Sequence, residues 1–223
     1  MNQWQEARKT VLETALEMCR KGLVVGNSGN ISFRLSPEGS RGIMAITPTS
    51  RHYDTLIPSD IPIIDFDGRT VDGKLKPSVE TPMHIAIYRA RENVNAVIHT
   101  HSVFASAVAV AGLEIPCILL DQIIFLGGEI KKSGGALVST PEQITDFIRA
   151  LGDRSAVLLP NHGAVGTGRT MRDAFNACEL IEKTARIYLL ALAAGKVNTL
   201  PEEVRKAEKR LYDILQNEGV STG

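Results

Sequence analysis

Two of the five histidines in this 223-residue chain stand two positions apart, in the stretch NAVIHTHSVFASAV that begins at Asn95. The apolar run before them predicts a strand, and on a strand His99 and His101 share one face because successive side chains alternate. Imidazole is a preferred zinc ligand, so two on one strand could hold two corners of a metal site. A pair of hydrogen-bonded surface histidines would show the same spacing, so the motif alone leaves both interpretations open.

A third histidine favours the metal. His162 ends another apolar run, in LLPNHGAVG, and Gly163 follows it directly. A strand end followed by glycine is a common setting for a side chain that faces a cleft. Catalytic zinc sites use three protein ligands and leave one position open for water or substrate. With His99 and His101, His162 would complete such a set.

The segment KPSVETPMH supplies a candidate carboxylate, Glu80, near the predicted start of a helix. An acid at that position can simply complement the helix dipole, or it can be a metal ligand or general base. His84 lies one turn further on, on the predicted inner face of the helix. We expect it to pack or to orient a neighbouring side chain rather than to bind metal.

Two loops rich in small polar residues, GNSGNIS at 26–32 and ITPTS at 46–50, offer backbone N–H groups and hydroxyls. Such groups can bind a phosphate, although they also form ordinary turns. Neither loop matches a nucleotide-binding fingerprint, because GNSGN lacks the required strand–loop–helix order.

Hydrophobic periodicity and capping residues predict the elements that must position these groups. Helices are expected at about 4–18, 81–92 (capped by Thr81 or Ser78), 103–111, 141–151, 171–194 and 201–217. Strands are expected at 30–35, 43–49, within 61–73 as a strand–turn–strand unit, at 95–101 and within 155–168, and residues 115–126 fit either type. SPEGSRG would connect the first two strands. Tight turns between several strands favour a mixed or antiparallel sheet covered by helices.

The bulk composition narrows the class of protein. The formal net charge is zero, 43% of residues are hydrophobic and 22% are charged, which is typical of a globular chain. The equal numbers of positive and negative charges give no reason to expect nucleic-acid or membrane binding. No apolar run approaches the 18 residues that would predict a membrane-spanning helix. Three dispersed cysteines without a CxxC motif, and an N-terminus unlike a signal peptide, predict a cytoplasmic protein.

Taken together and in this order, GNSGNIS, ITPTS, PSVETPMH, AVIHTHS and PNHGAVG resemble the class II aldolase/adducin family. The resemblance runs from the first predicted helix to Gly195. It implies one α/β domain over residues 1–223, a three-layer α/β/α fold with a largely antiparallel mixed sheet, and a C-terminal tail from about residue 200 that is free to move. It also implies a homotetramer with active sites at its subunit interfaces.

The resemblance assigns roles to individual residues. His99, His101 and His162 would bind one divalent metal per subunit, usually zinc. Glu80 would bind that metal without substrate and act as acid/base with it. The substrate phosphate would be held by Gly29, Asn30, Thr49, Ser50, Ser78 and Val79. Val79 stands where the family usually has serine, so this pocket keeps the backbone N–H there and loses one hydroxyl.

The implied activity is metal-dependent retro-aldol cleavage of a ketose 1-phosphate, such as fuculose 1-phosphate, to dihydroxyacetone phosphate and an aldehyde. The family's catalytic tyrosine after the residue matching Pro116 has no counterpart, so Asp121 and Tyr212 are the candidate second proton donors. An L-ribulose-5-phosphate 4-epimerase, a methylthioribulose-1-phosphate dehydratase and a non-catalytic adducin-like scaffold are the alternatives. A metal-dependent hydrolase of the HxHxD type is disfavoured, because no acid follows His101 closely.

Overall fold

The computed structural model describes residues 2–35 and 42–218. Its helices are α1 (Gln3–Arg20), α2 (Thr81–Ala90), α3 (Val103–Val110), α4 (Leu120–Leu126), α5 (Pro141–Leu151), α6 (Met171–Ala193) and α7 (Glu202–Glu218), with two short 3-10 turns at Tyr53–Thr55 and Pro58–Asp60. Its strands are β1 (Asn30–Leu35), β2 (Ile43–Ile46), β3 (Ile63–Asp65), β4 (Thr70–Asp72), β5 (Ala96–Thr100), β6 (Lys131–Lys132), β7 (Ala156–Leu159) and β8 (Gly163–Gly168). The predicted SPEGSRG connection lies almost entirely outside the described residues.

The described strands form one eight-stranded sheet in the order β4-β3-β2-β1-β5-β8-β7-β6. Only the β6–β7 pair is parallel among the described pairs, so the expected mixed and largely antiparallel sheet is confirmed. The central strands β5 and β8 are fully buried, as a strand covered on both faces should be. His99 therefore lies in the most buried part of the sheet, and His101 and His162 directly adjoin it.

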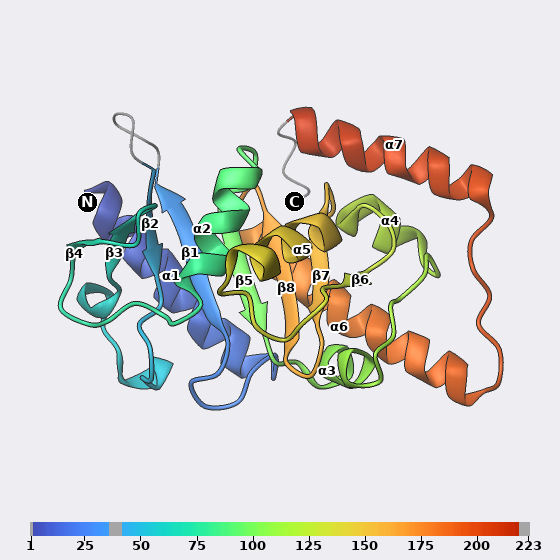
Figure 1. Ribbon diagram of the computed structural model, residues 1–223, viewed down its shortest axis with the longest axis horizontal. Coiled ribbons are helices and arrows are strands. Elements are labelled where there is room, and N and C mark those ends of the chain that lie inside the picture. Colours follow the sequence, from blue (N-terminus) through green and yellow to red (C-terminus); the bar gives the residue numbers. More distant parts are fainter. Residues whose placement is uncertain (1, 36–41, 219–223) are drawn as a thin grey trace.

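Helices cover both faces of the sheet and give it three layers (Figure 1). One apolar core joins α1 and the start of α6 to β1, β2, β3 and β5. A second core packs α2 and α5 against the opposite face, and a third packs α3, α4 and α6 around the β7–β8 end. None of the described helices is long and apolar enough to cross a membrane.

Three local predictions needed correction. Neither Thr81 nor Ser78 caps α2: the N-cap residue is Glu80, and the helix ends at Ala90 instead of Glu92. The ambiguous 115–126 segment divides into an isolated bridge between Ile115 and Ile130 and the short helix α4. The two-residue strand β6 was not expected, because a strand of that length has no periodicity to detect.

The capping box predicted for α5 is present, and it gives a simple test of the fold. The Thr140 side chain accepts a hydrogen bond from Gln143 N at 3.3 Å, and Gln143 Oε1 accepts from Thr140 N at 3.1 Å. Thr140→Ala removes the first bond and is expected to lower the free energy of unfolding by about 1 kcal/mol. Urea denaturation measures this, with the exposed Thr145→Ala on the same helix as the control. An unchanged midpoint would contradict the assignment.

Candidate metal centre and active site

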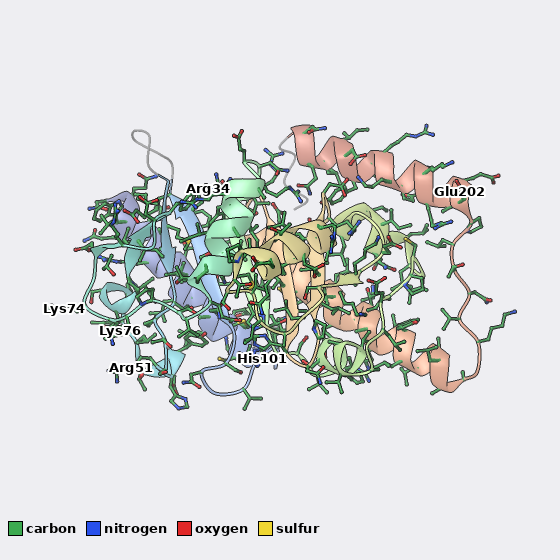
Figure 2. All side chains as sticks on the ribbon, viewed as in Figure 1. Arg34, Arg51, Lys74, Lys76, His101 and Glu202 are labelled. Atoms are coloured by element: carbon green, nitrogen blue, oxygen red, sulfur yellow. The ribbon has the colours of Figure 1, made fainter. Side chains whose placement is uncertain are left out.

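The three predicted histidines meet at one end of the central strands. His99 Nε2 lies 2.8 Å from His101 Nε2 and 3.2 Å from His162 Nε2. One nitrogen from each ring falls in a group whose members are all within 4.8 Å of one another. Figure 2 shows His101 at the lower end of the sheet, below β5 and β8. The i, i+2 pair and the distant third histidine thus form one cluster, as the sequence predicted.

Backbone contacts fix where each histidine stands. His99 is the fourth residue of β5, and His101 follows the strand, held by a bond from its N–H to Leu23 O at 3.1 Å. His162 sits in the tight turn between β7 and β8, where its N–H bonds Leu159 O at 3.1 Å. Gly163 must be glycine, because a Cβ there would lie 2.1 Å from the carbonyl oxygen of Thr100. That close approach of β8 to β5 brings His162 to the other two.

Hydrogen bonds at the far side of two rings set their tautomers. His99 Nδ1 lies 3.0 Å from Ala164 O, and His162 Nδ1 lies 2.8 Å from Ala136 O. A carbonyl only accepts, so each Nδ1 carries the proton and each Nε2 presents a bare lone pair to the cluster. Two lone pairs facing each other at 3.2 Å repel unless a cation lies between them. The donor set therefore fits a divalent transition metal.

Burial favours the neutral form of His99 and His101. His99 is fully buried, and desolvation, followed by the nearby His162 and His101, lowers its pKa well below the ordinary value. Desolvation and His162 also lower the pKa of His101, against an opposing effect of Glu80. Metal ligation needs the neutral ring, so His99 and His101 can bind a metal without first losing a proton.

Glu80 faces the same cluster. Its Oε2 lies 3.5 Å from His99 Nε2, and its Oε1 lies 3.7 Å from His162 Nε2. Although Glu80 is the N-cap residue of α2, its side chain caps no backbone N–H and points to the histidines instead. Its own backbone N–H is bonded to Ser78 Oγ at 3.2 Å. The carboxylate is close enough to the histidines to share a metal with them or to act beside it.

A series of hydrogen-bonded polar side chains, most of them buried, ends on the Glu80 carboxylate and holds it in place. Asn30 Nδ2 donates to Glu80 Oε2, and Asn30 Oδ1 lies 2.5 Å from His84 Nε2. On its other side, His84 Nδ1 lies 2.6 Å from Ser32 Oγ, which lies 2.7 Å from the Tyr88 hydroxyl. His84 thus orients a neighbour, as expected from its place on the helix. The sequence did not predict the series itself, because its members are 50 to 56 residues apart along the sequence.

The Asn30 amide determines the direction of donation in each hydrogen bond of this series. An amide nitrogen can only donate, so Asn30 must use its oxygen to accept from His84 Nε2–H. His84 is then the neutral Nε2–H tautomer, whose Nδ1 accepts from the Ser32 hydroxyl. Burial lowers the pKa of His84 to about 3, which keeps the ring neutral. Every member is satisfied only when Glu80 accepts, as a carboxylate does.

The residues predicted to hold a phosphate come from three segments around this site. Gly29 passes so close to β5 that a Cβ would lie 2.5 Å from His99 O, and Asn30 pairs with His99 in the β1–β5 register. The Asn30 side chain bonds Glu80 and His84, and its part in phosphate binding stays a prediction. The loop after β2 and the loop before α2 are joined by bonds from Thr49 N to Lys76 O and from Ser78 N to Thr47 O, both 3.0 Å. Side-chain hydroxyls come from Thr49, Ser50 and Ser78, next to the exposed Val79.

Comparison with known proteins decides the family. Residues 9–189 match the family described as Class II Aldolase and Adducin N-terminal domain. The chain belongs to the class II aldolase and adducin family. It is 34% identical over 199 residues to 5-deoxy-D-ribulose 1-phosphate aldolase of Bacillus thuringiensis serovar kurstaki, covering 89% of this chain and 92% of that protein. It is 36% identical over 185 residues to L-fuculose phosphate aldolase of Escherichia coli K12, covering 83% of each.

A solved structure supports the same membership in the class II aldolase and adducin family. The structure of an L-fuculose 1-phosphate aldolase superposes with a TM-score of 0.86 at 28% identity, over 93% of this chain and 96% of that one. The three-layer fold expected from the sequence is therefore confirmed.

Tyr212 and Asp121, the two candidates for the second proton donor, do not lie beside the histidine cluster of the same subunit. Tyr212 lies on α7 with its side chain buried. Its hydroxyl donates to Asp153 O at 2.7 Å and lies 3.0 Å from Ser155 Oγ. Ser155 directly precedes β7, whose opposite end leads into the turn that carries His162. Asp121, at the start of α4, forms an ion pair with Lys183 of α6. Either residue would have to act from another subunit, and this stays a prediction.

Proposed function

We propose that this protein is a divalent-metal-dependent aldolase that cleaves a ketose 1-phosphate to dihydroxyacetone phosphate and an aldehyde. The carrying observation is the convergence of three histidine Nε2 atoms with the Glu80 carboxylate 3.5 and 3.7 Å from two of them. The names of the aldolase relatives support the same reaction. Zinc is the proposed metal, one per subunit, because three imidazoles and an open position suit it.

His99, His101 and His162 would hold the metal, with Glu80 as a detachable fourth ligand. When bound, the metal supplies Lewis-acid polarisation of the ketose carbonyl and of the hydroxyl beside it. The protein's own part is positioning and proton transfer. The Ala164 and Ala136 carbonyls hold two of the imidazoles in the correct tautomer, and Asn30 holds the Glu80 carboxylate.

The reaction requires two proton transfers. The C4 hydroxyl loses a proton as the C3–C4 bond breaks, and the bonding electron pair stays with C3. C3 then takes up a proton to give dihydroxyacetone phosphate. We assign the proton at C3 to Glu80, because its carboxylate lies beside the metal ligands. A second group would accept the C4 proton, and we propose that it comes from a neighbouring subunit of a homotetramer, with Tyr212 and Asp121 as the candidates.

Two basic side chains, those of Arg51 and Lys76, favour binding of an anionic substrate at this end of the molecule. Arg51 follows the Thr49–Ser50 loop, and Lys76 accepts the Thr49 N–H on its carbonyl. Neither makes an ion pair within the described part of the chain, and Figure 2 shows both on the same lower side of the molecule as His101. We propose that their positive charge assists the phosphate-binding hydroxyls of Thr49, Ser50 and Ser78.

The test is metal analysis followed by a substrate panel. Purified protein is stripped with a chelator, reloaded with Zn²⁺, Mn²⁺ or Co²⁺, and assayed for dihydroxyacetone phosphate release from fuculose, ribulose and 5-deoxyribulose 1-phosphates. We expect chelation to abolish cleavage and one of the metals to restore it. Absence of cleavage by metal-loaded protein across the panel would refute the aldolase. Interconversion of ribulose 5-phosphate epimers by the same preparations would establish the epimerase instead.

A further inference from the structure

A cavity lies between α7 and the body of the protein, at the opposite end of the sheet from the histidine cluster. It measures about 550 Å³ and is lined among others by Gly127, Gly128, Arg154, Arg205, Lys209 and Arg210. We call it the α7 cavity. Figure 1 shows α7 running beside α4, and Figure 2 shows Glu202, at the first turn of α7, far from His101. The proposed metal ligands do not line this cavity, and the Tyr212 ring lies against Gly127 of its wall.

The acidic residues of the α7 cavity are already neutralised. Glu129 forms an ion pair at 3.1 Å with Lys131, which does not line the cavity. Glu202 pairs with Lys206 at 2.6 Å, one turn along α7. Neither carboxylate is therefore left to balance the remaining cations of the lining.

Most of the basic residues of the α7 cavity are not neutralised. Lys209 is held by Asp153 at 2.7 Å and by Asp213 on the same helix. Three arginines of the cavity lining, Arg154, Arg205 and Arg210, have no carboxylate of a described residue within 4.0 Å of the guanidinium. Three uncompensated positive charges around one cavity repel one another, and an anion would relieve that repulsion.

The guanidinium of Arg154 is only partly satisfied within the described residues. Its Nη2 donates to Ala150 O at 2.6 Å, whereas its Nε is buried and makes no hydrogen bond to a described residue. A buried guanidinium N–H without an acceptor is unfavourable and uncommon. Its backbone lies against Gly127, another residue of the lining, since a Cβ there would be 3.3 Å from Arg154 Cα.

Arg154 and Arg205 line the cavity together with Cys117. Burial, followed by Glu129, raises the pKa of the Cys117 thiol, while Arg205 and Arg154 oppose that rise. Arg205 belongs to α7 and Arg154 to the segment before β7. Their fields meet at the cavity wall although they come from different parts of the chain.

We propose that the α7 cavity binds a small phosphate-bearing anion, at a site separate from the histidine cluster. Guanidinium groups suit this ligand because their planar N–H forks match the geometry of phosphate oxygens. The volume is within the range of small-molecule sites. Since Arg205 and Arg210 lie on α7 and Arg154 on the body, a bound anion would link the two and hold α7 in place.

Inorganic pyrophosphate is the probe, titrated into the metal-loaded full-length protein at a constant ionic strength of about 0.15 M. Thermal unfolding and calorimetry report binding, because a ligand of the folded state alone raises Tm. We expect the Arg205→Gln/Arg210→Gln variant, altered only on exposed positions of α7, to bind pyrophosphate at this site roughly tenfold more weakly or worse. Arg154→Gln is a second variant from the other wall and should weaken binding in the same way.

Two matched variants distinguish this site from other anion binding. Lys9→Gln/Arg149→Gln removes the same net charge from exposed positions elsewhere and should bind like wild type. Arg51→Gln/Lys76→Gln removes two charges near the proposed substrate site and should keep the α7 response. If only the Arg51/Lys76 variant loses the Tm shift, pyrophosphate binds at the substrate site alone and the proposal is wrong. Tighter binding of citrate than of pyrophosphate would overturn the assignment to phosphate.

Discussion

Glu80→Gln is expected to lower kcat for ketose 1-phosphate cleavage by about 10²- to 10⁴-fold, the usual contribution of a general acid–base group. The substitution removes the titratable oxygen and preserves the shape of the side chain. The glutamine carbonyl can still accept from Asn30 Nδ2, so the chain of hydrogen bonds through His84 is kept. The histidines are unchanged, so metal content should stay at one equivalent per subunit. Steady-state kinetics and metal analysis on the same preparation measure both.

The control for this substitution is Glu13→Gln, the same change on the exposed face of α1, where Glu13 pairs with Lys9 at 3.7 Å. It should leave kcat and metal content as in wild type. Turnover of Glu80→Gln within twofold of wild type, with metal retained, would show that Glu80 is not the acid/base. A loss of metal in step with activity would assign Glu80 to metal binding alone.

The parts of the site that the sequence predicted are those governed by short-range rules. Strand alternation placed His99 and His101 on one face, and a glycine after a strand end marked His162 as a residue facing a cleft. Alternating strands and helices with tight turns predicted the mixed sheet. These inferences need only neighbours along the chain, and the structure confirms the mixed sheet and brings the three histidines together.

What escaped prediction depends on the register of distant segments. The pairing of Asn30 with His99 across β1 and β5 brings Asn30 beside Glu80, 50 residues away. No local pattern encodes that register, so the bond between Asn30 and Glu80 was not predicted. The α2 cap was misjudged for a related reason. Thr81 and Ser78 are better capping residues by propensity, but the side chain at the cap position is held by tertiary contacts.

The second large effect is expected from His84→Leu, which breaks the hydrogen-bond chain in its middle. The substitution leaves two buried groups one hydrogen bond short: Asn30 Oδ1 loses its donor, and the Ser32 hydroxyl loses its acceptor while keeping its contact with Tyr88. Each such group costs about 1–3 kcal/mol, so we expect the free energy of unfolding to fall by about 2–5 kcal/mol. Urea denaturation measures it. His52→Leu, the same change at an exposed histidine, should have little effect.

His84→Leu should also impair catalysis without removing the metal. In wild type, the His84 Nε2–H bond fixes which end of the Asn30 amide faces Glu80. Without it the amide can rotate and turn its oxygen toward the carboxylate, where two acceptors repel. A bond to a charged group is worth about 1.5–3 kcal/mol, so kcat is expected to fall about tenfold or more. A merely structural role would lower the yield of folded protein and leave its kcat intact.

The decisive comparison combines His84→Leu with Glu80→Gln. A glutamine at position 80 can rotate its own amide and donate to Asn30 Oδ1, so it pairs with Asn30 in either orientation. In that background, loss of His84 should cause no further fall in kcat, and part of its effect on stability should disappear. The double-mutant cycle then gives a coupling energy of about 0.5–3 kcal/mol between residues that do not touch through their side chains. Strictly additive effects would show that His84 packs the core without holding Glu80.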